Sequence, residues 1–200
     1  MSVTSWLRLS AAVDALNRRV GRYVSWLILG MTAISALNAL SRKLLNYSSN
    51  AFLEVQWYLF AAVFMLAAGY TLLSNEHVRV DILNTRLRLR ARLWIEIIGT
   101  VFFLWPFTLL ILWYGWPYFV LSYRTGEWSL NAGGLIIWPV KLLIPLGFLL
   151  LFLQGVSQFI KLAAALRGRS DPRPLLERHS PLDDEVRAMF GDQRDGGSAR

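Results

Sequence analysis

The apolar and polar positions alternate in long blocks along the chain. Four apolar blocks approach or exceed the roughly 20 residues that an α-helix needs to span the hydrocarbon of a bilayer. They cover about Tyr23–Leu40, Val55–Leu73, Ile97–Leu121 and Leu135–Ile160. Because only helices and closed barrels satisfy their backbone hydrogen bonds in lipid, runs of this length predict helices. The pattern therefore predicts an all-α, polytopic membrane protein with four transmembrane helices.

The segments outside these blocks divide the chain into three parts. Residues 1–22 are expected to form a cytoplasmic amphipathic segment, with Leu9, Val13, Leu16 and Val20 at helical spacing. Such a segment either lies at the membrane interface or extends the first span, and the sequence favours neither. Residues 23–165 make the four-helix transmembrane domain. Residues 166–200 are expected to form a disordered cytoplasmic tail, because they are polar and carry Pro and Gly.

The connections between the spans are also predicted from their composition. Residues 41–54 are expected to form a short periplasmic turn, and the Arg-rich stretch at 86–94 is expected to form a helix whose arginines reach lipid headgroups. Pro106 and Pro117 each remove a backbone donor from the third span and are expected to kink it. Trp138 and Pro139 are predicted to begin the fourth helix.

The basic residues indicate how the chain crosses the membrane. The formal net charge is +8, with a sequence pI near 10.3. Arg and Lys are abundant before span one, between spans two and three, and after span four, and they are sparse in the other two connections. Cytoplasmic segments of membrane proteins carry such an excess, so both termini are predicted to be cytoplasmic. This distribution explains the basicity as a topology signal, and nucleic-acid binding is not expected.

The most polar connection, NEHVRVDIL at residues 75–83, raises the question of a metal or catalytic site. His77 stands beside Glu76 and close to Asp81, but a metal site usually draws three or more ligands from converging elements. The one other histidine, His179, lies in the tail. The chain has no cysteine, which excludes disulfides and iron–sulfur ligation. A structural connector at the membrane surface is the favoured interpretation, and no catalytic residue, metal or cofactor is assigned.

The centres of the four spans lack ionisable side chains altogether. No Asp, Glu, Lys, Arg or His occurs in 24–40, 55–73, 97–121 or 142–160. Ion-coupled carriers and pumps generally place such groups in the membrane, where they form the transport pathway. The nearest ionisable residues, Glu54, Glu96 and Lys141, lie at span ends, and Gln154, Ser157 and Gln158 are expected to hydrogen-bond between helices. A helper subunit fits this pattern better than a carrier or an enzyme.

Two motifs give the chain a family resemblance. HVRVD (His77–Asp81) follows the second span, and NAGGLIIWPVKLLIPLGFLLLFLQG leads into the fourth. Over about residues 15–165 the chain resembles the small membrane subunit of TRAP transporters, the tripartite ATP-independent periplasmic carriers of bacteria. In that family the small subunit supports a large elevator-type permease subunit in the inner membrane. A periplasmic binding protein delivers an organic anion to this pair, and a sodium gradient drives uptake.

The resemblance implies roles for two groups of residues. His77, Arg79 and Asp81 would form the cytoplasmic connector of a scaffold that contacts lipids and the large subunit. The connection SYRTGEWSLNAGG contributes the candidate docking residues for the binding protein, which are Arg124, Glu127, Trp128 and Asn131. A solvated turn is the equally weighted alternative for this connection. Two further alternatives stand for the whole chain: a membrane assembly factor without a transport role, and a lipid-modifying enzyme that uses Glu76 and His77.

Overall fold

The protein is a bundle of long helices. The computed structural model describes residues 3–45, 50–74 and 88–168. The helices are α1 (Val3–Leu45), α2 (Asn50–Leu73), α4 (Leu89–Gly99), the π-helical segment η1 (Thr100–Leu104), α5 (Trp105–Thr125) and α6 (Trp138–Leu166). Because α4, η1 and α5 follow one another without a gap, they form one spanning unit. Four helical units are thus long and apolar enough to cross a membrane, which confirms the predicted all-α, four-span fold.

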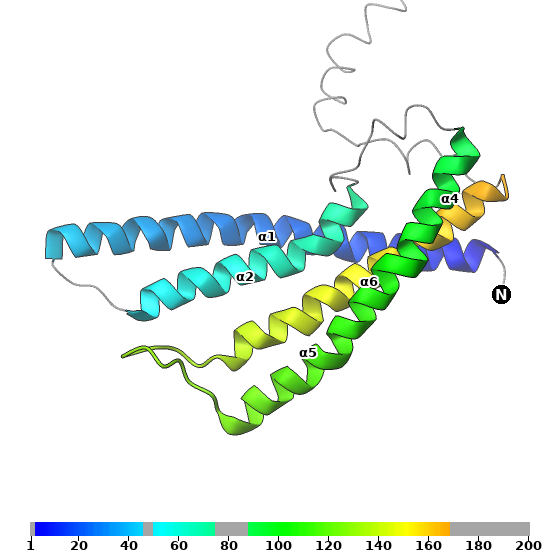
Figure 1. The fold of residues 1–200 in the computed structure, drawn as a ribbon. Coiled ribbons are helices and arrows are strands. Elements are labelled where there is room, and N and C mark those ends of the chain that lie inside the picture. The colour runs from blue at the N-terminus through cyan, green and yellow to red at the C-terminus, as the bar shows by residue number, and fades with distance from the viewer. Residues whose placement is uncertain (1–2, 46–49, 75–87, 169–200) are drawn as a thin grey trace, which may run out of the picture.

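The four units pack as a layer that opens at one end. Figure 1 shows α2 and α6 lying between α1 and α5, and the two outer helices spread apart toward the end that carries the loop after α5. α1 packs on α2 and on α6, and α5 packs on α6. α6 is therefore the central helix, which contacts every other spanning unit.

α1 is a single helix of 43 residues. It contains no proline, so nothing in the sequence breaks its ladder of backbone hydrogen bonds. The N-terminal segment is therefore an extension of the first span, one of the two alternatives left open by the sequence. The predicted boundary between residues 22 and 23 marks where this helix enters the membrane, and it stays a prediction. The expected turn at 41–54 is shorter than predicted, because α1 continues to Leu45 and α2 begins at Asn50.

The third span contains a local change of helix type just before its first proline. The backbone N–H of Trp105 donates to the carbonyl of Thr100, the five-residue spacing of a π-helix. Pro106 follows directly and has no N–H to donate. The ladder of α-helical backbone hydrogen bonds would therefore be interrupted here even without the π-helical segment. Helix then continues to Thr125 through Pro117. The 86–94 stretch is helical from Leu89, as predicted for that part.

The fourth helix begins at Trp138, with Pro139 in its first turn, as predicted. The apolar run itself begins three residues earlier, at Leu135, so the run is longer than the helix at this end. Leu135, Ile136 and Ile137 instead use their backbone groups within the preceding loop. Hydrophobicity alone does not separate these residues from the helix, because their partners lie elsewhere in the chain.

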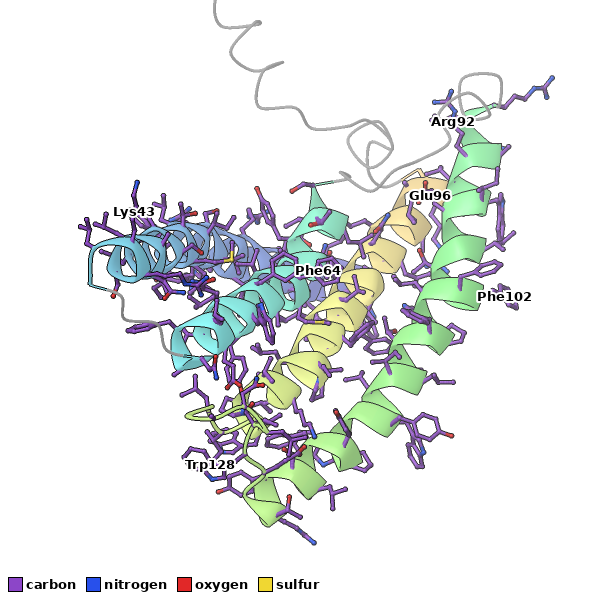
Figure 2. All side chains as sticks on the ribbon, turned by 60° about the vertical axis from the view of Figure 1, so that its left-hand side comes forward. Lys43, Phe64, Arg92, Glu96, Phe102 and Trp128 are labelled. Atoms are coloured by element: carbon purple, nitrogen blue, oxygen red, sulfur yellow. The ribbon has the colours of Figure 1, made fainter. Side chains whose placement is uncertain are left out.

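The surface of the bundle is apolar, whereas much of the buried part is polar. Phe102, Phe103 and Trp113 are 69–77% exposed, and Figure 2 shows Phe102 on the outer side of its helix. Where helices cross, small residues allow close approach: a Cβ at Gly147 would lie 2.5 Å from the carbonyl oxygen of Met65. Small and polar residues at helix crossings with apolar side chains outside are typical of membrane bundles.

Candidate functional sites at the two ends of the bundle

A cluster of polar side chains joins α1 to α6 near the N-terminal end of the chain. α1 contributes positions spaced by four and three residues, and α6 contributes positions spaced by three and four. Residues at these spacings share one face of a helix, so the two polar faces meet. We call this cluster the α1–α6 network; it consists of Ser10, Asp14, Asn17, Gln154, Ser157 and Lys161.

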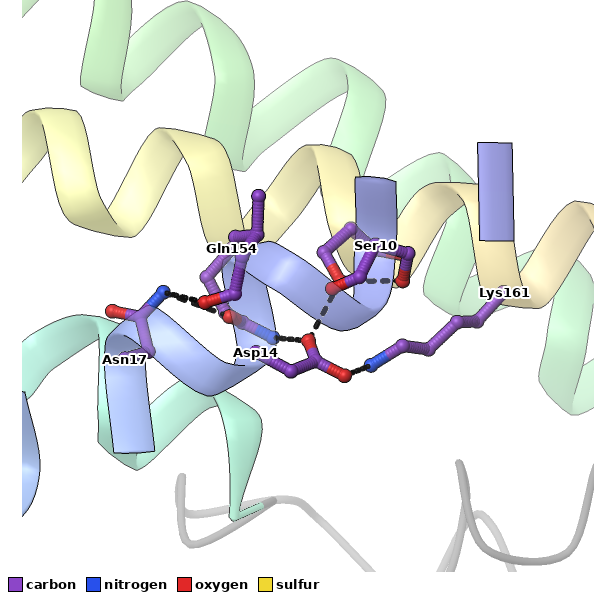
Figure 3. A network of polar contacts seen from close by, with 7 residues as sticks. Ser10, Asp14, Asn17, Gln154 and Lys161 are labelled. Carbon is purple, nitrogen blue, oxygen red and sulfur yellow. Dashed lines mark hydrogen bonds and ion pairs between the residues drawn. The ribbon is translucent and has the colours of Figure 1, made fainter. Parts of the chain in front are cut away.

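Asp14 is the centre of the α1–α6 network (Figure 3). Its Oδ1 accepts hydrogen bonds from Ser157 Oγ at 2.7 Å and from Gln154 Nε2 at 3.1 Å. Its Oδ2 forms an ion pair with Lys161 Nζ. Since the Ser157 hydroxyl has one proton and gives it to Asp14, Ser10 Oγ donates to Ser157 Oγ at 2.7 Å. Asn17 Nδ2 donates to Gln154 Oε1 at 2.9 Å, which fixes the orientation of that amide.

The network is buried and brings a third helix close. Asp14 is 7% exposed, and Asn17, Gln154 and Ser157 are at most 1% exposed. The Asn17 side chain faces Gly69 of α2, where a Cβ would lie 2.2 Å from Asn17 Oδ1. The predicted helix-to-helix role of Gln154 and Ser157 is confirmed. Sequence reasoning missed the Asp14–Lys161 pair, although the polar positions at helical spacing on both helices were a usable signal.

The loop between α5 and α6, residues 126–137, is folded back on itself at the other end of the bundle. Trp128 and Ile136 form an antiparallel bridge, and the N–H of Ser129 donates to the carbonyl of Leu135 at 2.9 Å. Gly126 and Gly133 adopt left-handed φ values of 58° and 70°, which glycine tolerates without strain. We call residues 126–137 the α5–α6 loop. The loop has a defined backbone shape, and whether it docks the binding protein or is a solvated turn stays a prediction.

Glu54 attaches this loop to α2. The side chain is 3% exposed and lies in the second turn of α2. Its Oε1 accepts hydrogen bonds from Ser129 Oγ and, at 2.8 Å, from Asn131 Nδ2. Its Oε2 accepts from the backbone N–H of Leu135 at 2.6 Å. One carboxylate therefore holds both sides of the loop, which is a strong arrangement because each bond has a charged acceptor.

A second carboxylate holds the loop to α6. Glu127 Oε2 lies 2.5 Å from Nζ of Lys141, and the same ammonium group lies 4.0 Å from the centroid of the Tyr118 ring. The hydrogen bond from Lys141 lowers the pKa of Glu127 below its usual value of 4.5. Lys141 is only 9% exposed, and the carboxylate of Glu127 in the loop balances its charge.

The sequence-predicted docking residues fall into two groups in the structure. Arg124 and Trp128 are exposed, and Figure 2 shows Trp128 at the tip of the bundle. Glu127 binds Lys141 and Asn131 donates to Glu54, so these two side chains help to hold the shape of the loop, although Asn131 is also exposed. Sequence reasoning missed Leu130, a fully exposed residue within the α5–α6 loop. The connector residues His77, Arg79 and Asp81 lie outside the described residues.

Comparison with protein families connects this architecture to a transporter component. The model for the family described as "Tripartite ATP-independent periplasmic transporters, DctQ component" matches residues 31–165. The chain belongs to this family. This match confirms the resemblance inferred from the HVRVD motif and the start of span four. The chain is the small membrane component of a TRAP transporter. A DctQ component is part of a transporter and its family is not an enzyme family.

The matched range contains the α5–α6 loop with both of its anchors, and it contains the α6 half of the α1–α6 network. Ser10, Asp14 and Asn17 precede the range, so the α1 half of that network lies outside it. Comparisons with curated proteins and with solved structures gave no match.

The α5–α6 loop should loosen in acid because Glu127 must be ionised to hold Lys141. The pKa of Glu127 is lower in the folded protein than in the unfolded chain, so the ionised carboxylate stabilises the loop at pH values above the unfolded pKa. This stabilisation is lost as the pH falls through the folded pKa. A nitroxide on Leu130→Cys, in a chain that has no other cysteine, should therefore stay immobile from pH 7 to about pH 5 and become mobile below pH 4.5.

The control for this experiment is the same label in a Glu127→Gln background. Glu54 is present in both proteins, so the difference between their pH profiles isolates Glu127. Identical electron paramagnetic resonance profiles in the two proteins would show that the Glu127–Lys141 pair does not hold the loop.

Proposed function

We propose that this chain is the small inner-membrane subunit that supports the large elevator-type permease subunit of a TRAP transporter and helps dock the periplasmic binding protein. The complex then takes up an organic anion, driven by a sodium gradient. The DctQ family match carries this proposal, because the family is one component of a tripartite transporter.

The scaffold role is supported by the chemistry of the helix surfaces. The third spanning unit exposes a row of large apolar side chains that a soluble protein would bury, among them Phe102, Phe107, Trp113 and Tyr114. Lipid or a membrane partner must cover such a surface. The span centres hold no ionisable residue, so the coupling ion and the substrate are expected to bind in the large subunit.

The docking role is supported by the α5–α6 loop. Trp128 and Leu130 are 63% and 103% exposed, while the backbone beneath them is fixed by Glu54 and by the Glu127–Lys141 pair. Apolar and aromatic anchors on a preorganised loop are the usual energetic centre of a protein interface. We propose that Arg124, Trp128 and Leu130 contact the binding protein, and that Glu127 and Asn131 position them.

The orientation in the membrane follows from the Arg distribution and is tested by labelling. A cysteine introduced at Ser129, in the α5–α6 loop, should react with an impermeant thiol reagent in whole cells. A cysteine at Ser74, which follows α2 at the opposite end of the bundle, should react only after the cells are opened. Protection at position 129 together with reaction at position 74 would reverse the proposed topology.

Purification of the complex tests the function itself. An affinity-tagged chain expressed with its genomic neighbours should retain a large multi-span permease through detergent purification. Deletion of the chain should abolish uptake that depends on the binding protein, because the permease loses its support. Purification without a permease, or uptake that survives the deletion, would favour the alternative of a membrane assembly protein without a transport role.

A further inference from the structure

A cavity of about 410 Å³ lies between α1, α5 and α6, and none of the residues of the two polar clusters lines it. α1 contributes Trp6 and Leu7, the first residue of α5 contributes Trp105, and one face of α6 contributes the rest. The volume is within the range of about 300–1,000 Å³ that is typical of small-molecule sites. Trp6 is 42% exposed, so the cavity reaches the surface of the bundle.

We call this cavity the slot, because its lining extends along one face of α6. Its α6 residues are Val156, Phe159, Ile160, Ala163, Ala164 and Arg167, a single helical face. At 1.5 Å per residue, the rise from Val156 to Arg167 is about 16 Å. One leaflet of a bilayer contributes about half of the roughly 30 Å hydrocarbon thickness. The slot is therefore about as long as one leaflet is thick.

The two ends of the slot differ in chemistry. Every lining residue except Arg167 is apolar or aromatic, and Arg167 is exposed where α6 ends. Ala163 provides the space next to Phe159 because its side chain is a single methyl group. An apolar slot of leaflet length with a cation at its aqueous end matches the form and the charge of an anionic phospholipid.

We propose that one anionic phospholipid occupies this slot, with an acyl chain against Phe159 and Ala163 and its phosphate at Arg167. Together with the topology under Proposed function, this places the lipid in the cytoplasmic leaflet. It would contact both α1 and the third span, which contribute Trp6, Leu7 and Trp105 to the lining. Arg167 also complements the carbonyl end of α6, so the test must separate headgroup binding from helix capping.

The probe is phosphatidylglycerol with a photoactivatable diazirine in one acyl chain, added to the delipidated purified complex in nanodiscs. Peptide mapping after irradiation should find the label on residues of the slot, around Phe159 and Ala163. Phosphatidylcholine with the same acyl chain should label them about fivefold less, the difference expected for one basic residue at an anionic headgroup. Inorganic phosphate should not compete, because it lacks the acyl chain.

Three variants complete the experiment. Ala163→Trp should abolish labelling of the slot by filling it, and the unchanged elution volume of the complex shows that the bundle still folds. Arg167→Gln should remove the preference for phosphatidylglycerol over phosphatidylcholine, whereas Arg19→Gln, an exposed arginine of α1 that does not line the slot, should preserve it.

The outcomes separate this inference from the proposed function. Labelling that is unchanged in Ala163→Trp, or equal for the two lipids in the native complex, overturns the lipid site. Labelling of the isolated chain but not of the complex also overturns it, since the large subunit would then cover the slot. Failure to obtain any complex with a permease counts against the proposed function instead.

Discussion

Replacing Asp14 with alanine should lower the thermal midpoint of the purified complex by roughly 6–12 °C. The substitution leaves the Lys161 ammonium group without its partner and removes the acceptor for Ser157 and Gln154. Breaking a buried ion pair from one side costs about 3 kcal/mol, and in a protein of this size 1 kcal/mol corresponds to about 2–4 °C. The midpoint is measured by size-exclusion chromatography after heating in detergent.

The double variant Asp14→Leu with Lys161→Met is the decisive comparison. It removes both charges, and apolar residues then fill the same space, so the part of the lost stability that comes from the unpaired Lys161 charge should return. Arg19→Gln, an exposed change on the same helix, should leave the midpoint within about 1 °C. A double variant as unstable as Asp14→Ala would show that the pair does not act as a unit.

Glu54→Gln should raise the concentration of binding protein needed for half-maximal uptake by about tenfold. The glutamine keeps one oxygen for Ser129 and Asn131, but its amide faces the N–H of Leu135, where the carboxylate accepted a hydrogen bond of 2.6 Å. Loss of charged hydrogen bonds of this kind costs about 1.5–3 kcal/mol, and each 1.4 kcal/mol is tenfold in affinity. The α5–α6 loop then samples other conformations, and docking of the binding protein must restore the native conformation.

Uptake into proteoliposomes, titrated with the binding protein, measures this effect. Maximal uptake at saturating binding protein should stay near the wild-type value, because Glu54 does not touch the helix faces proposed to support the permease. Trp57→Phe, on the exposed side of the same helix, is the matched control and should not change the titration. A normal titration in Glu54→Gln would mean that the loop shape does not matter for docking.

The sequence predicts the fold because lipid makes hydrophobicity a direct signal. The four apolar runs correspond to four helical units long enough to cross a membrane, but the fourth run begins before its helix does. Leu135 belongs to an apolar run, yet its N–H bonds to Glu54, 81 positions earlier in the chain. Such a pairing depends on how α2 and the α5–α6 loop are placed in space, which hydropathy does not encode.

The candidate sites were predicted less completely for the same reason. Trp128 is exposed, and its docking role stays a prediction. Glu127 and Asn131 make structural hydrogen bonds that their sequence neighbours do not indicate. The Asp14–Lys161 pair joins residues 147 positions apart and depends on the register of α1 against α6. Polar residues at helical spacing in Gln154 and Ser157 did indicate which face of α6 meets another helix.

The sodium dependence of uptake tests most directly whether this chain is a scaffold and docking subunit. Proteoliposomes with the purified complex, at saturating binding protein, are titrated with sodium for the native protein and for Glu54→Gln, Glu96→Gln and Lys141→Met. These three ionisable residues lie next to the uncharged stretches of the spans, and none is expected to bind the coupling ion. We expect one sodium affinity for all four proteins, whatever their maximal rates. A several-fold shift in sodium affinity in any variant with an intact complex would place part of the ion pathway in this chain and contradict the account.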